Sequence, residues 1–356
     1  MESFVPLGNE ALAQGALDAG LSGIYAYPGT PSTEIMEYVQ RSKEAAAHGV
    51  HCQWSTNEKT ALEAALGMSY AGKRAMACMK HVGLNVAADP FMNAAITGAH
   101  GGLIVAVADD PSMHSSQNEQ DSRYYGRYAM VPTLEPADQQ EAYDLPRYAF
   151  ELSEKYAIPV MVRMTTRLSH SRADIVRRET VPENPLSIPA NLRQFVLLPA
   201  VSRRNYAQLL EKQRDFEDEA ERSFLNRYED GPDTSLGIIT CGIAYNYLME
   251  NYPDGCPYPV LKLGQYPVPT RLVTHLAEAC EAILVLEEGA PLVEEMLRGY
   301  PVDSGRVRGR LDGTLPRAGE LNPNLVATAL GLEEREPVFA APDLLVGRPP
   351  QLCDGC

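Results

Sequence analysis

Short runs of apolar residues alternate along this chain with segments in which apolar positions recur roughly every three to four residues. The short runs are typical of buried strands, and the longer spacing is typical of amphipathic helices. Regular alternation of the two predicts an α/β fold with a parallel sheet. The pattern extends from the N-terminus to about residue 180 and resumes near residue 235, which indicates two α/β domains.

The first stretch contains helices that each lead into a strand. We predict the helices at Glu10–Ala19, Ala61–Tyr70, Ala94–Ala99 and Glu141–Tyr156. The strands that follow them are predicted, in the same order, at Gly23–Tyr27, Arg74–Met79, Gly102–Ala108 and Pro159–Thr165. The second contains predicted strands at Gly237–Cys241, Val260–Leu263 and Ile283–Glu287, with helices at Gly242–Glu250 and Arg271–Ala279.

Prolines divide these stretches from the rest of the chain. Pro182, Pro185, Pro189 and Pro199 indicate a linker, and a charged helix at Tyr206–Tyr228 follows it. We therefore predict four parts: a domain at 1–180, a linker and charged helix at 181–234, a smaller domain at 235–332, and a proline-rich linker at 333–356 that leads to a further domain.

The composition excludes several classes of protein. The chain has 31 Lys and Arg against 47 Asp and Glu, a net charge of −16, and its basic residues do not cluster, so nucleic acid is not an expected partner. No apolar run approaches the roughly 18 residues of a spanning helix, and the N-terminal residues lack the features of an export signal. The seven scattered cysteines indicate reduced thiols, so we expect a cytoplasmic protein with no membrane partner.

Two segments look like functional motifs and are weak candidates. Gly67-Met-Ser-Tyr-Ala-Gly-Lys-Arg74 resembles a phosphate-binding loop, but it ends in Arg where that loop needs Ser or Thr, and it ends a helix instead of following a strand. Cys353 and Cys356 have the spacing of half a metal site or of a redox pair, and two cysteines alone complete neither. Neither segment therefore indicates the chemistry.

The predicted strands of the first domain are followed by polar residues. In open α/β sheets, ligands bind beyond the carboxyl ends of the strands. Thr30, placed as a helix N-cap with Pro31 at the first helical position, follows the first strand. The next two strands lead to candidate site residues, which are Lys80, His81, Asn85, His114, Ser116 and Gln117. Solvated loops and helix caps are the alternative explanation for this set.

Glu58 has two interpretations. Ser55-Thr56-Asn57-Glu58 fits the capping box S-x-x-E, in which the Glu side chain accepts a hydrogen bond from a backbone N–H at the start of a helix. Periodicity alone favours this structural role over a functional one.

Several of these motifs occur together in one known family. Tyr27-Pro-Gly-Thr-Pro-Ser-Thr-Glu34, Asn57-Glu58-Lys59, Met79-Lys-His-Val-Gly-Leu-Asn85 and Ala108-Asp-Asp-Pro-Ser-Met-His-Ser-Ser-Gln-Asn-Glu-Gln-Asp121 resemble the alpha subunit of the indolepyruvate type of 2-oxoacid:ferredoxin oxidoreductase, a thiamine-diphosphate-dependent family. The resemblance extends through Gly237–Tyr245 and Val285–Gly289 and covers essentially the whole chain.

The resemblance implies a fold and a role for the candidate residues. Residues 1–180 match the domain that binds the aminopyrimidine ring of thiamine diphosphate, and residues 235–332 resemble the carboxy-terminal domain of transketolase. Glu58 falls on the glutamate that hydrogen-bonds ring nitrogen N1′, a contact that lets the exocyclic nitrogen take the proton from thiazolium C2. Thr30 resembles the threonine that faces the 2-oxoacid. Among the other candidates, Lys80, His81 and Asn85 are assigned to the cofactor, and His114, Ser116 and Gln117 to the substrate.

The chain also departs from the family pattern. Full-length members continue after Cys353-Asp-Gly-Cys356 into a diphosphate-binding domain with a G-D-G…N magnesium motif, and then into a cysteine-rich ferredoxin domain. We expect this chain to hold half of the thiamine diphosphate site and to be inactive alone, with Mg²⁺ and iron–sulfur clusters bound elsewhere in the complete enzyme. The implied partners are a diphosphate-binding domain or subunit, the beta subunit, ferredoxin, a 2-oxoacid and coenzyme A, in a homodimer or hetero-oligomer.

Two other functions are compatible with the sequence. One is a non-catalytic scaffold that keeps the fold without the chemistry, and the other is a component of a non-oxidative thiamine-dependent 2-oxoacid decarboxylase, which needs no iron–sulfur partner. Glu287 and Glu288, at the end of a predicted strand, are interpreted as structural or interface residues.

Overall fold

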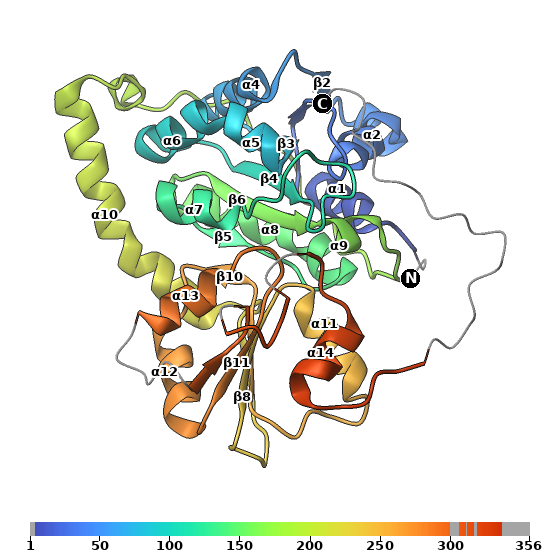
Figure 1. Ribbon diagram of the computed structural model, residues 1–356. Coiled ribbons are helices and arrows are strands. Elements are labelled where there is room, and N and C mark those ends of the chain that lie inside the picture. Colours follow the sequence, from blue (N-terminus) through green and yellow to red (C-terminus); the bar gives the residue numbers. More distant parts are fainter. Residues whose placement is uncertain (1–3, 300–305, 311, 317–318, 337–356) are drawn as a thin grey trace.

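The computed structural model describes residues 4–299, 306–310, 312–316 and 319–336, which form two α/β units (Figure 1). The first sheet has seven strands, in the order β10 (Gln265–Tyr266), β5 (Thr133–Leu134), β6 (Val160–Thr165), β4 (Leu103–Asp109), β3 (Ala75–Lys80), β1 (Gly23–Ala26) and β2 (His51–Trp54). The second has five, in the order β12 (Val307–Arg308), β11 (Ile283–Leu286), β8 (Gly237–Cys241), β9 (Val260–Leu263) and β7 (Arg227–Glu229).

Both sheets are dominated by parallel strands, as the alternating pattern predicts. Strands β2, β1, β3, β4, β6 and β5 pair in parallel, and only β10 joins the first sheet antiparallel, through β5. In the second sheet, β7 is the antiparallel strand. The predicted strands Gly237–Cys241 and Val260–Leu263 are confirmed with identical bounds. The α/β fold class is therefore confirmed.

Helices alternate with the strands along the chain. Those of the first unit are α1 (Gly8–Asp18), α2 (Thr33–Arg41), α3 (Lys43–Ala47), α4 (Glu58–Tyr70), α5 (His81–Val86), α6 (Ala88–Thr97), α7 (Arg123–Ala129), α8 (Gln139–Tyr156) and α9 (Thr166–His170). A 3-10 turn at Leu192–Phe195 precedes α10 (Pro199–Arg222), and the second unit has α11 (Ala244–Asn251), α12 (Thr270–Ala279), α13 (Leu292–Arg298) and α14 (Pro323–Leu330). In the described part of the chain, none of the helices combines the length and apolar character that a membrane span requires.

The central strands are buried on both faces. Successive residues of a strand point to opposite sides of the sheet, and in β4 Ile104 belongs to one hydrophobic cluster while Val105 belongs to another. The first cluster includes residues of α1 and α8, and the second includes residues of α4 and α6. This two-sided burial explains why the strand has the continuous apolar run from which it was predicted.

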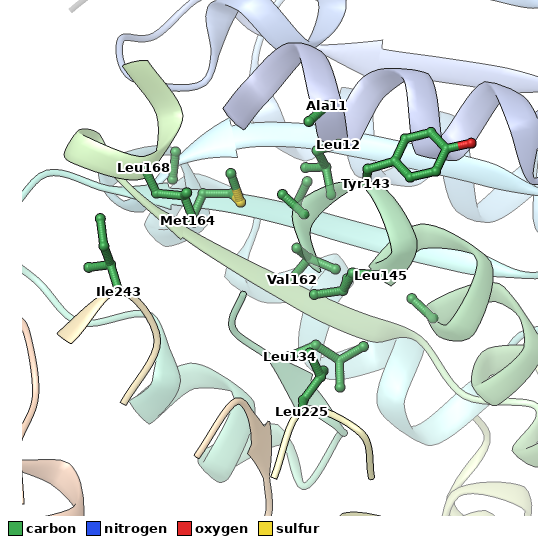
Figure 2. Packing of buried hydrophobic residues seen from close by; sticks show 14 of the residues in the cluster. Ala11, Leu12, Leu134, Tyr143, Leu145, Val162, Met164, Leu168, Leu225 and Ile243 are labelled. Atoms are coloured by element: carbon green, nitrogen blue, oxygen red, sulfur yellow. The ribbon is translucent and has the colours of Figure 1, made fainter. Parts of the chain in front are cut away.

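The first hydrophobic cluster continues from one unit into the other. Figure 2 shows Leu12 of α1 and Leu145 of α8 against Val162 of β6, with Leu225 and Ile243 of the later chain below them. The two sheets therefore share one apolar core. The short strand β10, which comes directly after β9 along the chain, adds to this contact because it pairs with the first sheet and not the second.

The charged helix differs from its prediction. It was expected at Tyr206–Tyr228 and is found at Pro199–Arg222, with Pro199 at its first turn. Proline fits the first turn because that position needs no N–H donor, so the proline interpreted as a linker residue begins the helix instead. Arg227 and Tyr228, the last two residues of the predicted helix, belong instead to edge strand β7 (Arg227–Glu229). The tail at 337–356, with Cys353 and Cys356, lies outside the described residues.

Charged side chains are buried where the two units meet. Arg123 of α7 donates to Asp121 (2.6 Å), to the Glu287 carboxylate (3.0 Å) and to the carbonyl of Ala290 (2.9 Å). Arg163 of β6 pairs with Asp109 and Glu135 and donates to the carbonyl of Glu288. We call these residues with Arg310 the junction cluster: Asp109, Asp121, Arg123, Glu135, Arg163, Glu287, Glu288 and Arg310. The interface role expected of Glu287 and Glu288 agrees with these contacts.

Two helix glycines provide a test of the packing. A Cβ on Gly15 of α1 would overlap the backbone carbonyl of Tyr143 in α8, whereas a Cβ on Gly67 of α4 meets no atom within 4 Å. We expect Gly15→Ala to destabilise the chain by about 1–3 kcal/mol through overpacking, and Gly67→Ala to stabilise it by about 0.5–1 kcal/mol because Ala loses less backbone entropy in a helix. Denaturant unfolding measures both, and a stabilising Gly15→Ala would contradict the α1–α8 contact.

Candidate functional site

The carboxyl ends of four neighbouring parallel strands form one edge of the first sheet. Strands β1, β3, β4 and β6 end at Ala26, Lys80, Asp109 and Thr165, and each leads into a loop or helix that carries polar residues. Because the strands are parallel, these segments gather at the same edge. The edge is the candidate functional site.

Glu58 lies at this edge, after β2, as the first residue of α4. The helix N-cap is Asn57, whose side chain accepts a hydrogen bond from the backbone N–H of Thr60. The expectation that Ser55 and Glu58 form the capping box is therefore wrong. The cap lies two residues further along because the Asn57 side chain reaches the N–H of Thr60, so the Glu58 carboxyl does not close the capping box.

The Glu58 carboxyl is largely withdrawn from water, since the residue is only 8% exposed. Burial raises the pKa of this carboxyl, although its own backbone N–H and the charge of Lys80 both favour the ionised form. Gly83 of α5 lies directly against it, so that any Cβ at this position would overlap the carboxyl group. A carboxyl with a raised pKa at a strand end is suited to sharing a proton with a ligand.

Lys80 links three of the loops at this edge. It is 2% exposed, its aliphatic chain lies against Gly29 of the loop after β1, and its Nζ donates to the carbonyl of Ser115 at 3.0 Å. The Ser115 hydroxyl in turn donates to the carbonyl of Thr30 at 3.1 Å. The loops after β1 and β4 are thus held together over the end of β3.

Asp110 organises the loop after β4. Its carboxylate accepts hydrogen bonds from the Ser115 N–H (2.8 Å), the Ser116 hydroxyl (2.7 Å) and the Thr166 hydroxyl (2.7 Å). Burial raises the pKa of Asp110, but these hydrogen bonds outweigh it and the net shift is downward. The predicted substrate residue Ser116 is therefore turned toward Asp110.

Thr30 is at the site but does not cap a helix. Helix α2 begins at Thr33 with Ser32 as its N-cap, so the predicted N-cap at Thr30 is wrong. The chain first makes a turn in which both the N–H and the hydroxyl of Ser32 donate to the carbonyl of Gly29. That turn delays the helix and leaves the half-exposed Thr30 at the edge of the site.

The other predicted residues lie in different surroundings. His81 is buried and contacts the carbonyl of Asn118 through Nε2 at 3.0 Å. Asn85 is exposed and accepts from the Tyr125 hydroxyl. His114 lies half-exposed, 3.5 Å from the Glu320 carboxylate of the second unit, and Gln117 is exposed. The structure thus brings Glu58, Lys80 and Thr30 together and leaves Asn85, His114 and Gln117 at the rim.

The residues that arrange the site were not predicted. Asp110, Ser115 and Gly83 carry its internal contacts, yet none was singled out from the sequence. The one available signal was Asp110-Pro111-Ser112, since Asp before Pro and Ser is typical of a turn held by the Asp side chain. No sequence pattern predicted that Gly83 packs against Glu58.

The comparisons with known proteins identify the family. The family described as "Pyruvate flavodoxin/ferredoxin oxidoreductase, thiamine diP-bdg" matches residues 14–195, about half of the chain and most of the first unit. The chain belongs to this thiamine diphosphate-binding family, which confirms the family resemblance.

Curated relatives show which type of subunit within this family the chain is similar to. The chain is 43% identical to indolepyruvate oxidoreductase subunit IorA of Methanothermobacter marburgensis, with 98% of this chain and 58% of that protein aligned. It is 40% identical to the subunit of the same name from Pyrococcus abyssi, with 100% of this chain and 58% of that protein aligned. The chain therefore spans less than two thirds of the length of these relatives.

Two solved structures share the fold. The 2-oxoglutarate:ferredoxin oxidoreductase of Magnetococcus marinus, solved with 2-oxoglutarate, coenzyme A and succinyl-CoA bound, superposes with a TM-score of 0.71 at 17% identity, over 92% of this chain and 65% of that one. A split-gene transketolase, described as an inactive beta4 tetramer, gives a TM-score of 0.55 at 16% identity, over 91% and 97%. Both show that this chain shares its fold with these enzymes, which agrees with the predicted α/β fold class.

The role of Asp110 can be tested through stability. We expect Asp110→Asn to destabilise the chain by about 1–3 kcal/mol at neutral pH, because the hydrogen bonds to a charged acceptor are weakened. Since the folded-state pKa of Asp110 is lowered, its contribution is present above the unfolded-state pKa of about 3.9 and is lost as the pH falls through the folded value. The difference from wild type, measured by denaturant unfolding, should stay constant from about pH 5 to 8.

The matched control is Asp89→Asn. Asp89 is an exposed carboxylate paired with Lys59 and should change the unfolding free energy by less than about 1 kcal/mol. An Asp110→Asn variant as stable as this control would show that the loop does not depend on Asp110.

Proposed function

We propose that this chain supplies the aminopyrimidine-binding half of a thiamine diphosphate site in an oxidoreductase that oxidatively decarboxylates arylpyruvates, with indolepyruvate as the expected substrate. The observation that carries the proposal is Glu58, a buried carboxyl with a raised pKa that is not a helix cap and stands at a strand end of a sheet of this family. The relatives named indolepyruvate oxidoreductase support the substrate class.

The residues present fit a flat, proton-sharing ring. An aromatic ring beside the Glu58 carboxyl requires that no side chain of α5 packs over that carboxyl. Gly83, which approaches it closely from α5, meets this requirement because it has no side chain. Lys80 and Gly29 line the adjoining strand end. When bound, thiamine diphosphate supplies the carbon nucleophile and the electron sink of the decarboxylation.

The task of Glu58 is to hold a proton at ring nitrogen N1′. A carboxyl can donate a proton to this nitrogen and take it back, and a pKa raised by burial brings the two protonation states closer in free energy near neutral pH. Lys80 lies near enough for its charge to lower that pKa in part. The protein therefore contributes orientation and one tuned hydrogen bond.

Substrate would approach from the loops after β1 and β4. Thr30 stands at their contact through Ser115, while His114 and Gln117 are exposed at the rim. Lys80 provides positive charge at the strand ends, which suits the carboxylate of a 2-oxoacid. We assign Thr30 to the substrate carbonyl side and leave Ser116 a structural role through Asp110.

The remaining half of the site comes from outside these residues. The relatives are longer than this chain, which covers 58% of each. We propose that the diphosphate, Mg²⁺ and iron–sulfur clusters are bound by the additional domain or by partner subunits, and that ferredoxin and coenzyme A are used by the assembled enzyme. A fold relative that had coenzyme A bound supports the acyl acceptor.

Glu58→Gln in the assembled oxidoreductase tests the proposal. Gln keeps the shape of the carboxyl but cannot pass a proton to N1′, so proton–deuteron exchange at thiazolium C2 should slow by roughly 10²–10⁴-fold. The unfolding free energy should change by less than about 1 kcal/mol, because Asn57 and not Glu58 caps α4.

Glu63→Gln, an exposed position on the same helix, is the control and should exchange at the wild-type rate. Wild-type exchange in a folded Glu58→Gln enzyme would remove the cofactor role from Glu58 and with it the proposed function.

The half-site also predicts the behaviour of the chain alone. Calorimetry with thiamine diphosphate and Mg²⁺ should give weak binding, because Mg²⁺ bound through carboxylates and substrate phosphates provides much of the affinity for such ligands and its motif lies outside this chain. Adding a protein that carries the diphosphate-binding domain should raise the affinity. Tight, magnesium-dependent binding to the chain alone would contradict the division of the site.

A further inference from the structure

The segment that joins the two units presents apolar side chains to solvent. Of the fourteen large apolar side chains that are exposed in the described part of the chain, seven lie within residues 186–210. Five of them precede α10 and two lie on it: Leu186, Ile188, Leu192, Val196 and Leu198, then Tyr206 and Leu210. We call residues 186–210 the linker face. Single exposed apolar residues are common, but a group of them is typical of a surface that binds another molecule.

Contacts with the first unit hold the linker face in one place. The backbone N–H of Ser187 donates to the carbonyl of Ala71 at 2.9 Å, directly after α4. The ring centroid of Phe195 lies 3.8 Å from that of Tyr70, the last residue of the same helix. Asn205 of α10 then donates to a carbonyl of the 3-10 turn at 3.0 Å. The extended part, the 3-10 turn and the first turns of α10 therefore form one continuous surface.

The exposed apolar residues of α10 are not the ones that attach this helix to the protein. Figure 1 shows α10 along the outer edge of the molecule, where it contacts α6 of the first unit and α12 of the second. Leu209 and Phe216 of α10 are buried in the same hydrophobic cluster as residues of α4 and α6. Tyr206 and Leu210, one helical turn apart, each follow a buried residue and remain exposed. They are therefore available to another molecule.

The charge of the linker face is opposite in sign to that of the whole chain. Residues 184–210 contain no Asp or Glu, although the chain carries 47 of them and a net charge of −16. Arg193, Arg203 and Arg204 are exposed, and no carboxylate of the described chain lies within ion-pair distance of their guanidinium groups. Because interacting surfaces carry complementary charges, the linker face favours an acidic partner.

The linker face lies at the opposite edge of the first sheet from the candidate site. Ser187 contacts Ala71 and His100, which precede β3 and β4, whereas the candidate site is at the carboxyl ends of these strands. Strands of this length span about 20 Å. A partner on the linker face therefore binds at a different edge from the half that completes the thiamine diphosphate site, and its binding does not depend on the role proposed for Glu58.

We propose that the linker face docks an acidic polypeptide surface with an apolar centre, carried by a different chain. The stretch 186–210 is about as long as the roughly 20–30 residues that each side of a stable interface contributes. Its apolar side chains form the centre of the contact, and its arginines bind carboxylates at the rim. A second copy of this chain, docked through the same face, would bring two sets of arginines together. An anionic membrane would be approached by a protein of net charge −16.

A pair of designed peptides tests this chemistry. The first is an amphipathic helix with leucines on one face and glutamates on the other, and the second has lysines in place of the glutamates. In fluorescence anisotropy with the full chain, the glutamate peptide should bind at least about tenfold more tightly than the lysine peptide. Its affinity should fall as salt rises from about 50 to about 300 mM. Equal binding of the two peptides, or no saturable binding of the glutamate peptide, would overturn the proposal.

Two double variants separate the apolar centre from the charged rim. Ile188→Ser with Leu192→Ser removes apolar side chains, and Arg203→Glu with Arg204→Glu reverses charges. Each should weaken binding of the glutamate peptide at least about tenfold. Both should melt within about 2 °C of wild type, because all four side chains are exposed. Wild-type affinity in either folded variant would contradict the proposal.

Matched controls lie outside the linker face. Arg41→Glu with Arg271→Glu makes the same change in net charge at two exposed positions, and Val176→Ser removes an exposed apolar side chain. Both controls should bind the glutamate peptide like wild type. A loss of affinity in the arginine control as large as that of Arg203→Glu with Arg204→Glu would show that net charge, and not this face, determines binding, and would refute the proposal.

The other possible occupants are outcomes of two further assays. Sedimentation over a range of protein concentrations reports a second copy of this chain on the face, and flotation with phosphatidylglycerol vesicles reports lipid. Self-association or vesicle binding that Ile188→Ser with Leu192→Ser abolishes would assign the face to that occupant and overturn the proposal. None of these measurements needs thiamine diphosphate or substrate, so a negative result for the linker face and a negative result for Glu58 can be told apart.

Discussion

Arg123 and Arg163 are buried among carboxyl groups contributed by both α/β units, and the candidate site depends on this arrangement. Arg123 reaches Asp121 and Glu287, and Arg163 reaches Asp109 and the Glu288 carbonyl. Removing one partner of a buried ion pair leaves a desolvated charge, which costs several kcal/mol. The two units are therefore held in one relative position by buried charges, which are not hydrated and depend on each other for compensation.

The same cluster also anchors the loop that carries much of the site. Asp109 and Asp121 lie near the two ends of the loop at 110–122, and each is bound to an arginine of the cluster. Asp110 then shapes the interior of the loop, and Ser115 ties it to Lys80. A contact between units thus determines where the loop sits over β3. This coupling explains why charged residues are tolerated in so buried a position.

Periodicity was sufficient for the parallel strands β1, β3, β4, β6, β8, β9 and β11 and for about half of the described helices, because a strand buried on both faces shows a continuous apolar run and an amphipathic helix shows its stripe. It was insufficient at Pro199, where the same residue can end or begin a helix, and at Thr30 and Ser55, where short side chains compete to cap. The shortest strands, such as β5 and β10, carry too few residues for a period.

Gly83 and Asp110 were missed because their roles depend on partners that are distant in sequence or set by the loop conformation. Glu58 was singled out through resemblance to a family, and the structure adds that its carboxyl is buried and does not close the capping box.

Fold alone does not determine function, and the relatives illustrate this: a transketolase and a 2-oxoglutarate oxidoreductase both share the fold at under 20% identity. In this chain, carboxyl groups are buried at the strand ends of the first sheet in two different surroundings. On the β2 side, the Glu58 carboxyl is kept from water and does not close the helix capping box. On the β6 side, the carboxyl groups of Asp109, Asp121 and Glu135 are paired with arginine. Arginines are therefore the partners of these three carboxyl groups, whereas at Glu58 the charge of Lys80 lowers the pKa only in part and burial still raises it.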